Sequence, residues 1–168
     1  NRTELRSILT GEILWKINEN YTKAHVSLTD RFILGLRPDG TLIKRDLLNG
    51  EQILTLKQHP SRFYDHAISP DGSLIAAGYQ DDWVRIYQTR TGELLGVLDG
   101  SARSLSFSSD ATLLAAGLKN GVLRIFELAR GRYFDLENGH AAPVTALHFS
   151  PDGTRLISAG LDCSISRW

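Results

Sequence analysis

Three stretches of this chain repeat one another and align without a gap. They span residues 71–87, 110–126 and 152–168 and read DGSLIAAGYQDDWVRIY, DATLLAAGLKNGVLRIF and DGTRLISAGLDCSISRW. Each begins with Asp and ends sixteen positions later with an aromatic residue, and the copies recur every 39 to 42 residues. Self-similarity at such a period is typical of repeat architectures, in which each repeat forms one small unit of secondary structure.

Each repeat contains short runs rich in Val, Ile, Leu and aromatic residues. In the last repeat the runs 144–149, 155–159 and 164–168 are separated by a Ser-Pro-Asp-Gly turn at 150–153 and by a turn around Asp162. Such closely spaced runs predict strands and tight turns, and in the earlier repeats a fourth run follows a recurrent glycine. A four-stranded antiparallel sheet cannot bury both of its faces alone. We therefore predict an all-β fold in which such sheets stack as the blades of a β-propeller.

The last repeat resembles the WD-repeat family. It has a Gly-His pair ahead of its first predicted strand, a Ser-Pro-Asp-Gly turn, and then Ser158, Asp162 and Trp168. In that family a His, a Ser or Thr, an Asp and the Trp form a hydrogen-bonded tetrad. The resemblance implies this structural tetrad for His140, Ser158, Asp162 and Trp168. The chemistry is suitable, because a buried indole N–H and an imidazole both require hydrogen-bond partners.

The other repeats match the same pattern less completely. The repeat that ends at Tyr87 keeps His59 and Asp81, with Ala in place of the Ser or Thr. The resemblance therefore assigns His59, Asp81 and Tyr87 to a degenerate tetrad. The repeat that ends at residue 126 has Asn in place of the Asp and no His, and the first repeat keeps Asp39 alone.

We predict one propeller segment over residues 1–168, built of about four blades. An outer strand at 10–17 precedes the blades, which cover approximately residues 23–56, 62–98, 103–136 and 143–168. Propellers of the WD-repeat family usually have seven or eight blades, so the resemblance implies part of such a ring. The chain begins at Asn1 and contains no Met, which favours a fragment over a four-bladed ring that closes on itself. Pairing with further blades or with a second copy is the corresponding expectation.

The charge balance excludes several classes of partner. Lys plus Arg and Asp plus Glu both number 19, so the chain lacks the basic excess that phosphate neutralisation on nucleic acid requires. No apolar run is long enough to span a bilayer, and no signal peptide pattern is present. The single cysteine, Cys163, excludes an internal disulfide framework. We expect a cytoplasmic protein that binds neither nucleic acid nor a membrane.

No pattern for catalysis or metal binding is found. The sequence contains no HExxH, CxxC, GxSxG or P-loop motif. His59 and His140 both lie eleven residues before the Pro of a predicted turn, and this repeated placement favours a structural role. Adjacent acids such as Asp81 and Asp82 lie in predicted turns, where Asp side chains bond the local backbone. We expect no catalytic residue, no metal site, no cofactor and no enzyme activity.

The remaining candidates lie on the surface. In the family, the loops before the first strands and between the second and third strands gather on one face, where partners usually bind. Tyr, Trp and Arg are frequent among the residues that dominate interfaces. For Tyr64 and Trp83, packing between blades is an equal alternative. The candidate contacts on this partner-binding face are Arg62, Tyr64, Tyr79, Gln80, Trp83, Arg103, Lys119 and Leu161.

These features favour a non-catalytic scaffold that docks other proteins, or other domains of the same polypeptide, as a docking or sensor module. One alternative is a quinoprotein-like propeller enzyme or cofactor-binding propeller, because residues 10–17, TGEILWKI, resemble the tryptophan-containing repeats of that group. It would require a tryptophan stacked on the cofactor and calcium ligands near the ring axis. However, Trp15, Trp83 and Trp168 lie at non-equivalent or structural positions. The other alternative is a purely structural segment that completes a ring.

Overall fold

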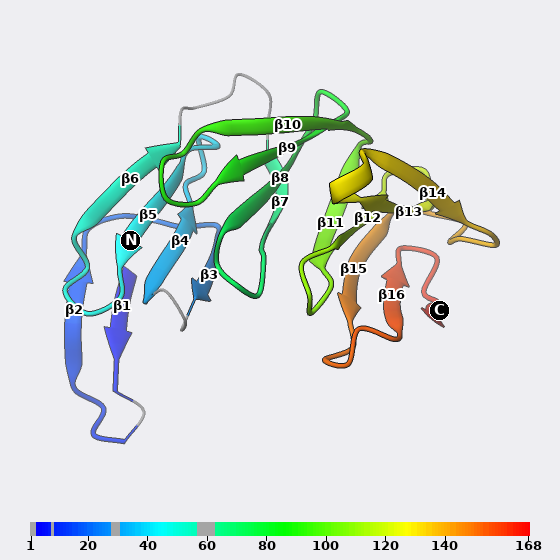
Figure 1. Cartoon of the computed structure of the whole chain (residues 1–168). Helices are drawn as coiled ribbons and strands as arrows, with labels where there is room; N and C mark the ends of the chain where they lie inside the picture. Colours follow the sequence, from blue (N-terminus) through cyan, green and yellow to red (C-terminus); the bar gives the residue numbers. More distant parts are fainter. Residues whose placement is uncertain (1–2, 8, 28–30, 57–62) are drawn as a thin grey trace. The chain divides into compact units, whose positions relative to one another are not determined.

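The computed structural model describes residues 3–7, 9–27, 31–56 and 63–168, with the backbone alone for Phe63 (Figure 1). Within these ranges the secondary structure consists of β-strands and one short 3-10 turn, Leu128–Arg130. The chain divides into two compact units, Asn1–Arg62 and Phe63–Trp168. Each unit has sheets of its own.

The first unit contains a hairpin and a four-stranded antiparallel sheet. Trp15 in the hairpin lies on Gly50, in the turn between the last two strands of the sheet, and its indole N–H donates to the Leu47 carbonyl at 2.9 Å. A Cβ on Gly50 would meet the indole ring, so this position requires glycine. The hairpin pairs β1 (Thr3–Arg6) with β2 (Ile13–Ile17), and the sheet has the order β3 (Lys23–Ser27), β4 (Phe32–Leu36), β5 (Leu42–Asp46) and β6 (Gln52–Leu56).

The second unit contains three antiparallel sheets whose strands follow chain order. The prediction of an all-β chain built of four-stranded antiparallel sheets is confirmed. The number of blades in a complete ring stays a prediction. The first sheet contains β7 (Phe63–Ile68), β8 (Leu74–Tyr79), β9 (Trp83–Gln88) and β10 (Leu94–Asp99); the second contains β11 (Ala102–Phe107), β12 (Leu113–Leu118), β13 (Leu123–Glu127) and β14 (Arg132–Leu136); the third contains β15 (Val144–Phe149), β16 (Leu156–Gly160) and β17 (Ile165–Arg167).

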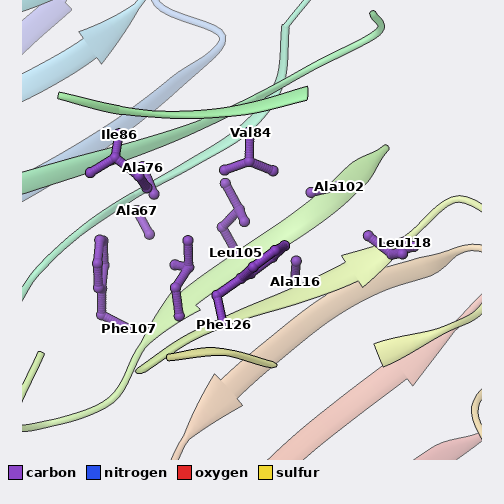
Figure 2. Packing of buried hydrophobic residues seen from close by; sticks show 11 residues of the cluster. Ala67, Ala76, Val84, Ile86, Ala102, Leu105, Phe107, Ala116, Leu118 and Phe126 are labelled. Carbon is purple, nitrogen blue, oxygen red and sulfur yellow. The ribbon is translucent and has the colours of Figure 1, made fainter. Parts of the chain in front are cut away.

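Successive sheets of the second unit pack through apolar side chains. Ala76 and Val84 of the first sheet belong to one buried cluster with Leu105 of the second (Figure 2). The second sheet uses its other face as well, where Leu123 clusters with Leu147 of the third sheet. Because both faces of this middle sheet are covered, β12 reads as the continuous apolar run LLAAGL rather than as an alternating pattern.

Polar side chains also join the first strands of successive sheets. In each case a side-chain oxygen accepts a hydrogen bond from a backbone N–H of the next sheet, so both groups are buried without loss of a partner. Asp65 and Ser104 hold equivalent places, six residues before the Asp that opens a repeat. The contacts join Asp65 Oδ2 to the Leu105 N–H at 2.9 Å, Ser104 Oγ to the Leu147 N–H at 3.1 Å, and Ser106 Oγ to the Phe149 N–H at 3.3 Å.

Each first strand of the second unit contains a β-bulge at the same place. The register shifts at Tyr64 in β7, at Arg103 in β11 and at Thr145 in β15, so one residue of each strand has no paired residue in the neighbouring strand. The β3–β4 pairing of the first unit continues without a shift. A bulge redirects the side chain of the extra residue, and bulges are frequent at rims and functional sites.

Candidate protein-interaction face

The last sheet contains a continuous chain of polar contacts. The Trp168 indole N–H donates to Ser158 Oγ at 3.0 Å, and Ser158 Oγ lies 2.8 Å from His140 Nε2. His140 Nδ1 lies 3.1 Å from Asp162 Oδ1. Because the Ser158 oxygen already accepts from Trp168, its hydroxyl is free to donate to Nε2. Nδ1 then carries the imidazole proton and donates a hydrogen bond to the carboxylate of Asp162.

Asp162 connects these polar contacts to two loops. Its carboxylate accepts the hydroxyl of Ser164 at 2.8 Å and the N–H of Ala141, in the loop before β15, at 2.9 Å. The hydrogen bond from Ser164 and these further donors hold the pKa of Asp162 well below its ordinary value. The charged carboxylate therefore fixes the turn between β16 and β17 against the loop that precedes β15.

The turns between second and third strands share one backbone conformation. Gly40, Asp82, Gly121 and Cys163 hold equivalent places and have φ of 86°, 67°, 90° and 62°. Two of these positions carry side chains in the left-handed region, which is rare outside glycine. At Gly121 a Cβ would lie 1.9 Å from the His140 carbonyl oxygen, so no side chain fits there.

The first sheet of the second unit departs from the tetrad pattern. Asp81 binds Arg85 through two contacts, Oδ1 to Nη1 at 3.1 Å and Oδ2 to Nη2 at 2.6 Å. The Arg85 guanidinium lies 4.9 Å from the centre of the Tyr79 ring, and the Tyr79 hydroxyl hydrogen-bonds with Tyr87. Burial and this hydrogen bond raise the pKa of Tyr79. His59, the remaining residue assigned here, lies outside the described residues.

This packing corrects one prediction. Tyr79 was expected on the partner-binding face, but its side chain is only 1% exposed. The residue is the last of β8, and the strand directs its ring under Arg85 rather than into solvent. Spacing alone did not distinguish the end of a buried strand from the start of its turn.

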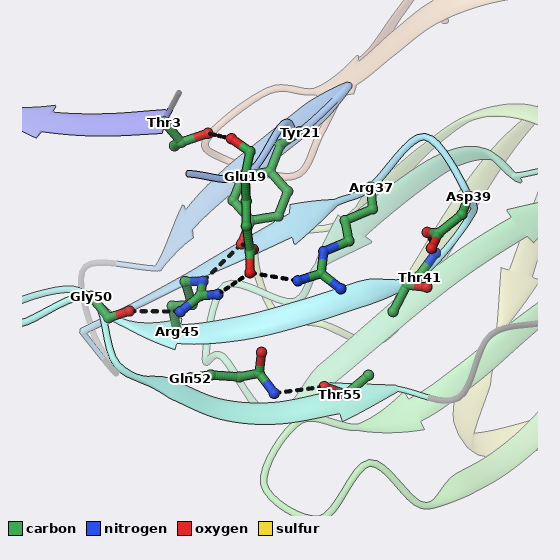
Figure 3. Close-up of polar contacts among 10 residues, drawn as sticks. All are labelled: Thr3, Glu19, Tyr21, Arg37, Asp39, Thr41, Arg45, Gly50, Gln52 and Thr55. Atoms are coloured by element: carbon green, nitrogen blue, oxygen red, sulfur yellow. Dashed lines mark hydrogen bonds and ion pairs between the residues drawn. The ribbon is translucent and has the colours of Figure 1, made fainter. Parts of the chain in front are cut away.

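The first unit contains a charged network that sequence reasoning missed (Figure 3). Arg45 is buried and donates to Glu19 Oε1 at 2.7 Å, to the Tyr21 hydroxyl at 2.8 Å and to the Gly50 carbonyl at 2.9 Å. Arg37 donates to the same Glu19 oxygen. Burial raises the pKa of Glu19, but the hydrogen bonds from Tyr21, Arg45 and Arg37 outweigh it, so the pKa is lowered overall.

The positions of this network repeat those of the tetrad. Arg45 holds the place of Trp168, and Glu19 lies four residues before β3 as His140 lies four residues before β15. The signal in the sequence was Arg45 itself, a charged residue in a column of aromatic ones. Arg45 indicated that a network other than the tetrad fills this place. Its partners could be identified only from the three-dimensional structure.

The other predicted contacts lie at or near the surface. Gln80, Trp83, Lys119 and Leu161 are exposed, with Trp83 at 43% and Leu161 at 62%. Tyr64 and Arg103, the residues at two of the β-bulges, are half-buried, and the Arg103 guanidinium lies 4.4 Å from the centre of the Tyr64 ring. Arg62 lies outside the described residues.

A groove of about 470 Å³ opens between the first and second sheets of the second unit. It lies where β10 ends and where β12 turns into β13. On one side Arg124 bridges two acids, Asp99 at 3.2 Å and Asp135 at 2.7 Å. No sequence pattern predicts this groove, because its walls come from separate repeats and share no local motif. Its lining residues are Asp82, Asp99, Gly100, Ser101, Leu118, Lys119, Asn120 and Arg124.

The described residues provide neither a metal-binding cluster nor a membrane-spanning helix. Across the ranges that the structure describes, no three His, Cys, Asp or Glu side chains gather closely enough to hold a metal ion. Within the same ranges no helix is long and apolar enough to cross a membrane.

The carboxyls of Asp110 and Asp152 have pKa values lowered to about 2, first of all because Ser108 and Ser150 donate hydrogen bonds to them.

Repeated four-stranded antiparallel sheets with connecting turns fixed in one conformation define a repeat protein of the β-propeller class. A family model described as "WD domain, G-beta repeat" matches residues 50–88, 92–127 and 133–168, which make up more than half of the chain. The chain therefore belongs to the WD40 repeat family. WD40 repeats serve in general as scaffolds for protein interaction and are generally non-catalytic.

Two relatives are similar to the chain in sequence. It is 27% identical to "Eukaryotic translation initiation factor 3 subunit I" of Bombyx mori over 170 residues, a match that covers 88% of this chain and 50% of the relative. It is 36% identical to "Meiotic recombination protein rec14" of Schizosaccharomyces pombe over 106 residues, which covers 61% of this chain and 35% of that protein. The chain thus spans half or less of the length of these relatives.

Proposed function

We propose that this chain is a protein-docking segment of a WD40 propeller and carries out no chemistry of its own. The observation that carries the proposal is the set of exposed side chains at the turns after β8, β12 and β16, which include Trp83, Lys119 and Leu161. The turns share a residue with positive φ at one place, and those after β12 and β16 are closed by backbone hydrogen bonds. A rigid frame of this kind presents side chains to a partner at a low entropic cost.

The environment of three turn carboxylates supports a structural rather than a catalytic role for them. A general acid that works near neutral pH requires a raised pKa, as burial produces. The pKa values of Asp110, Asp152 and Asp162 are instead lowered by donors in their own turns. These acids act as charged acceptors that hold turns in place.

The partners that we propose are other proteins or other domains of the same polypeptide. One relative is named as a subunit of a translation factor, so it belongs to an assembly, and we extend contact with neighbouring subunits to this chain by analogy. A cytoplasmic location is part of the proposal and is supported by the exposed free thiol of Cys163, since free thiols persist in reducing compartments.

The quinoprotein alternative receives less support. Trp15 packs on Gly50 and donates to a backbone carbonyl, and Trp168 donates to Ser158, so both indoles have structural partners. Of the three tryptophans, Trp83 alone is largely exposed, and it stands at a turn of the proposed docking face. Binding of pyrroloquinoline quinone with calcium, measured by calorimetry, would favour this alternative over docking.

Affinity capture with matched variants tests the proposal. The baits are the unmodified chain, a face variant with Gln80, Trp83, Lys119 and Leu161 changed to Ala, and a control with the exposed outer-strand residues Ile53, Leu95 and Tyr133 changed to Ala. We expect a protein that the unmodified chain and the control recover and that the face variant loses. Equal recovery by all three baits would contradict docking on this face.

A further inference from the structure

Among the described residues, the buried and half-buried arginines are paired with carboxylates of the same chain, with one exception. Five arginine side chains in the described ranges are buried or half-buried. Taking a guanidinium partly out of water is costly unless an acid compensates it, so such side chains are normally paired. Four of the five are paired: Arg37 and Arg45 with Glu19, Arg85 with Asp81, and Arg124 with Asp99 and Asp135. Arg103 has no carboxylate partner among the described residues.

The fold holds Arg103 in a defined orientation. Arg103 is the extra residue of the β11 bulge, and Tyr64 is the extra residue of the equivalent bulge in β7. The guanidinium lies 4.4 Å from the centre of the Tyr64 ring. Its Nε atom is buried without a hydrogen-bond partner in the described part of the chain. Contact with an aromatic face uses the flat side of a guanidinium and leaves the N–H groups at its edge to bind an acceptor.

We propose that Arg103 binds a carboxylate of the docked partner, so that the segment recognised on this face carries an Asp or Glu. This inference rests on the proposed docking function and specifies the chemistry of the partner. A guanidinium presents parallel N–H donors that match the two oxygens of a carboxylate. The charge of Arg103 matches that of one carboxylate, whereas a phosphate group carries about two negative charges at neutral pH.

The neighbouring charges define how far the acidic segment can extend. The exposed Lys119 is adjacent, because its backbone N–H donates to the carbonyl of Ser101, two residues before Arg103. Ser101 and Lys119 also line the groove, where Asp82 and Asp99 contribute negative charge. Asp99 is paired with Arg124, while Asp82 has no ion-pair partner among the described residues. A long acidic run would meet Asp82, so the expected partner has one acidic contact rather than an acidic tract.

Selection from a peptide library tests this inference. A phage library of random twelve-residue peptides is selected on the intact chain and on the Arg103→Gln and Arg103→Glu variants. The unmodified chain should enrich peptides with Asp or Glu at one shared position. Arg103→Gln should bind those peptides about tenfold or more weakly, since it loses a charge-assisted pair of hydrogen bonds. Arg103→Glu should enrich peptides with Lys or Arg at that position.

The controls separate recognition from folding. Arg103→Lys keeps the charge without the planar fork and should retain part of the affinity, whereas Tyr64→Phe keeps the aromatic face and should bind normally. The melting temperature of each variant shows whether it is folded, and the charge-reversed selection requires a folded protein in any case. Binding of the acidic peptides should also weaken as salt is raised.

The outcomes distinguish this inference from the docking function. Peptides that bind the unmodified chain and Arg103→Gln equally, with no shared acidic position, would overturn the role of Arg103 and leave docking supported. Synthetic copies of the enriched peptides with phosphoserine at the acidic position should bind no more tightly than the originals; much tighter binding that Arg103→Gln abolishes would also overturn the inference, since the ligand would then be a phosphate. Failure of every variant and of the unmodified chain to enrich any peptide would count against docking itself, and the inference would fail with it.

Discussion

Ser158 is the residue on which the polar contacts of the last sheet depend. Its hydroxyl oxygen accepts from the Trp168 indole and lies within hydrogen-bond distance of His140, and its side chain is fully buried. Replacement by Ala removes both contacts at once and leaves an indole N–H and an imidazole nitrogen without partners. In the first and second sheets of the second unit this position holds Ala77 and Ala116, which have no hydroxyl group.

Ser158→Ala is expected to lower the free energy of unfolding by about 1–3 kcal/mol, the usual cost of leaving a buried polar group unsatisfied. Urea denaturation followed by tryptophan fluorescence measures the change. Ser166→Ala in β17 is the control, because Ser166 has no side-chain hydrogen bond among the described residues, and its stability should stay near that of the unmodified chain. Equal effects of the two substitutions would contradict the structural role of the network.

The turn acids give the chain a pH dependence at the residue scale. The folded pKa values of Asp110 and Asp152 are about 2, below the ordinary value of 3.8, so folding favours their charged forms. Above 3.8 their contribution to stability is complete, and it is lost as the pH falls from 3.8 towards 2. The melting temperature should therefore drop across this window.

Asp110→Asn with Asp152→Asn is expected to flatten that drop, because amides do not titrate. Scanning calorimetry from roughly pH 5, about one unit above the window, down to about pH 2, its lower edge, provides the measurement. Ser108→Ala, which removes the largest cause of the lowered pKa of Asp110, should move the loss of stability to higher pH. A double variant with the same pH profile as the unmodified chain would show that other groups are responsible.

At the scale of elements, the connecting turns decide how neighbouring sheets approach one another. The turn between β12 and β13 lies against the loop that precedes β15, where the His140 N–H donates to the Gly121 carbonyl at 2.9 Å. Gly121 has φ of 90°, and a Cβ would overlap the His140 carbonyl oxygen. Cys163 occupies the equivalent place in the last sheet and is exposed.

Gly121→Ala is expected to cost about 2 kcal/mol or more, because backbone strain and a steric overlap add together. Cys163→Gly is the matched change in the opposite direction. It relieves a left-handed conformation worth roughly 1–2 kcal/mol and should leave stability unchanged or slightly raised, after the entropic cost of glycine. Thermal unfolding of both variants gives the comparison, and a stable Gly121→Ala would refute the close approach of turn and loop.

At the scale of the whole molecule, the last sheet of the second unit has one apolar face that no described residue covers. Ile157 is 50% and Ile165 77% exposed. At the equivalent places in the second sheet, Ala115 and Leu123 are buried against the third sheet. The same positions are therefore buried wherever a further sheet follows. Exposed apolar patches of this kind promote association.

Ile157→Asp combined with Ile165→Asp is expected to reduce concentration-dependent self-association while leaving the melting temperature within a few degrees. Analytical ultracentrifugation over a range of concentrations measures it. Ile53→Asp, at a residue on the outer strand β6 that is as exposed as Ile157, is the control and should not change association. If the control were as effective as the pair, general charge rather than this face would explain the effect.

Much of the fold could be predicted from the chain because repeats carry the same information several times. The gapless alignment of residues 71–87, 110–126 and 152–168 located second and third strands in three sheets, and the recurrent glycines located the fourth. The hairpin strand β1 was missed, since Thr3–Arg6 has no copy in a repeat with which to compare it. Tyr79 was misplaced because one position decides whether a side chain ends a buried strand or begins a turn.

The sequence by itself determined the all-β repeat architecture and the residues placed for a tetrad in the last sheet, because period and spacing are local properties of the chain. Tertiary structure alone decided which charges meet. Glu19 pairs with Arg45 across 26 residues, and Asp65 accepts from the backbone of Leu105 across 40. It also placed Arg103 against Tyr64 with no acid beside it among the described residues. Pairing between distant residues depends on how the sheets stack, which no local pattern encodes.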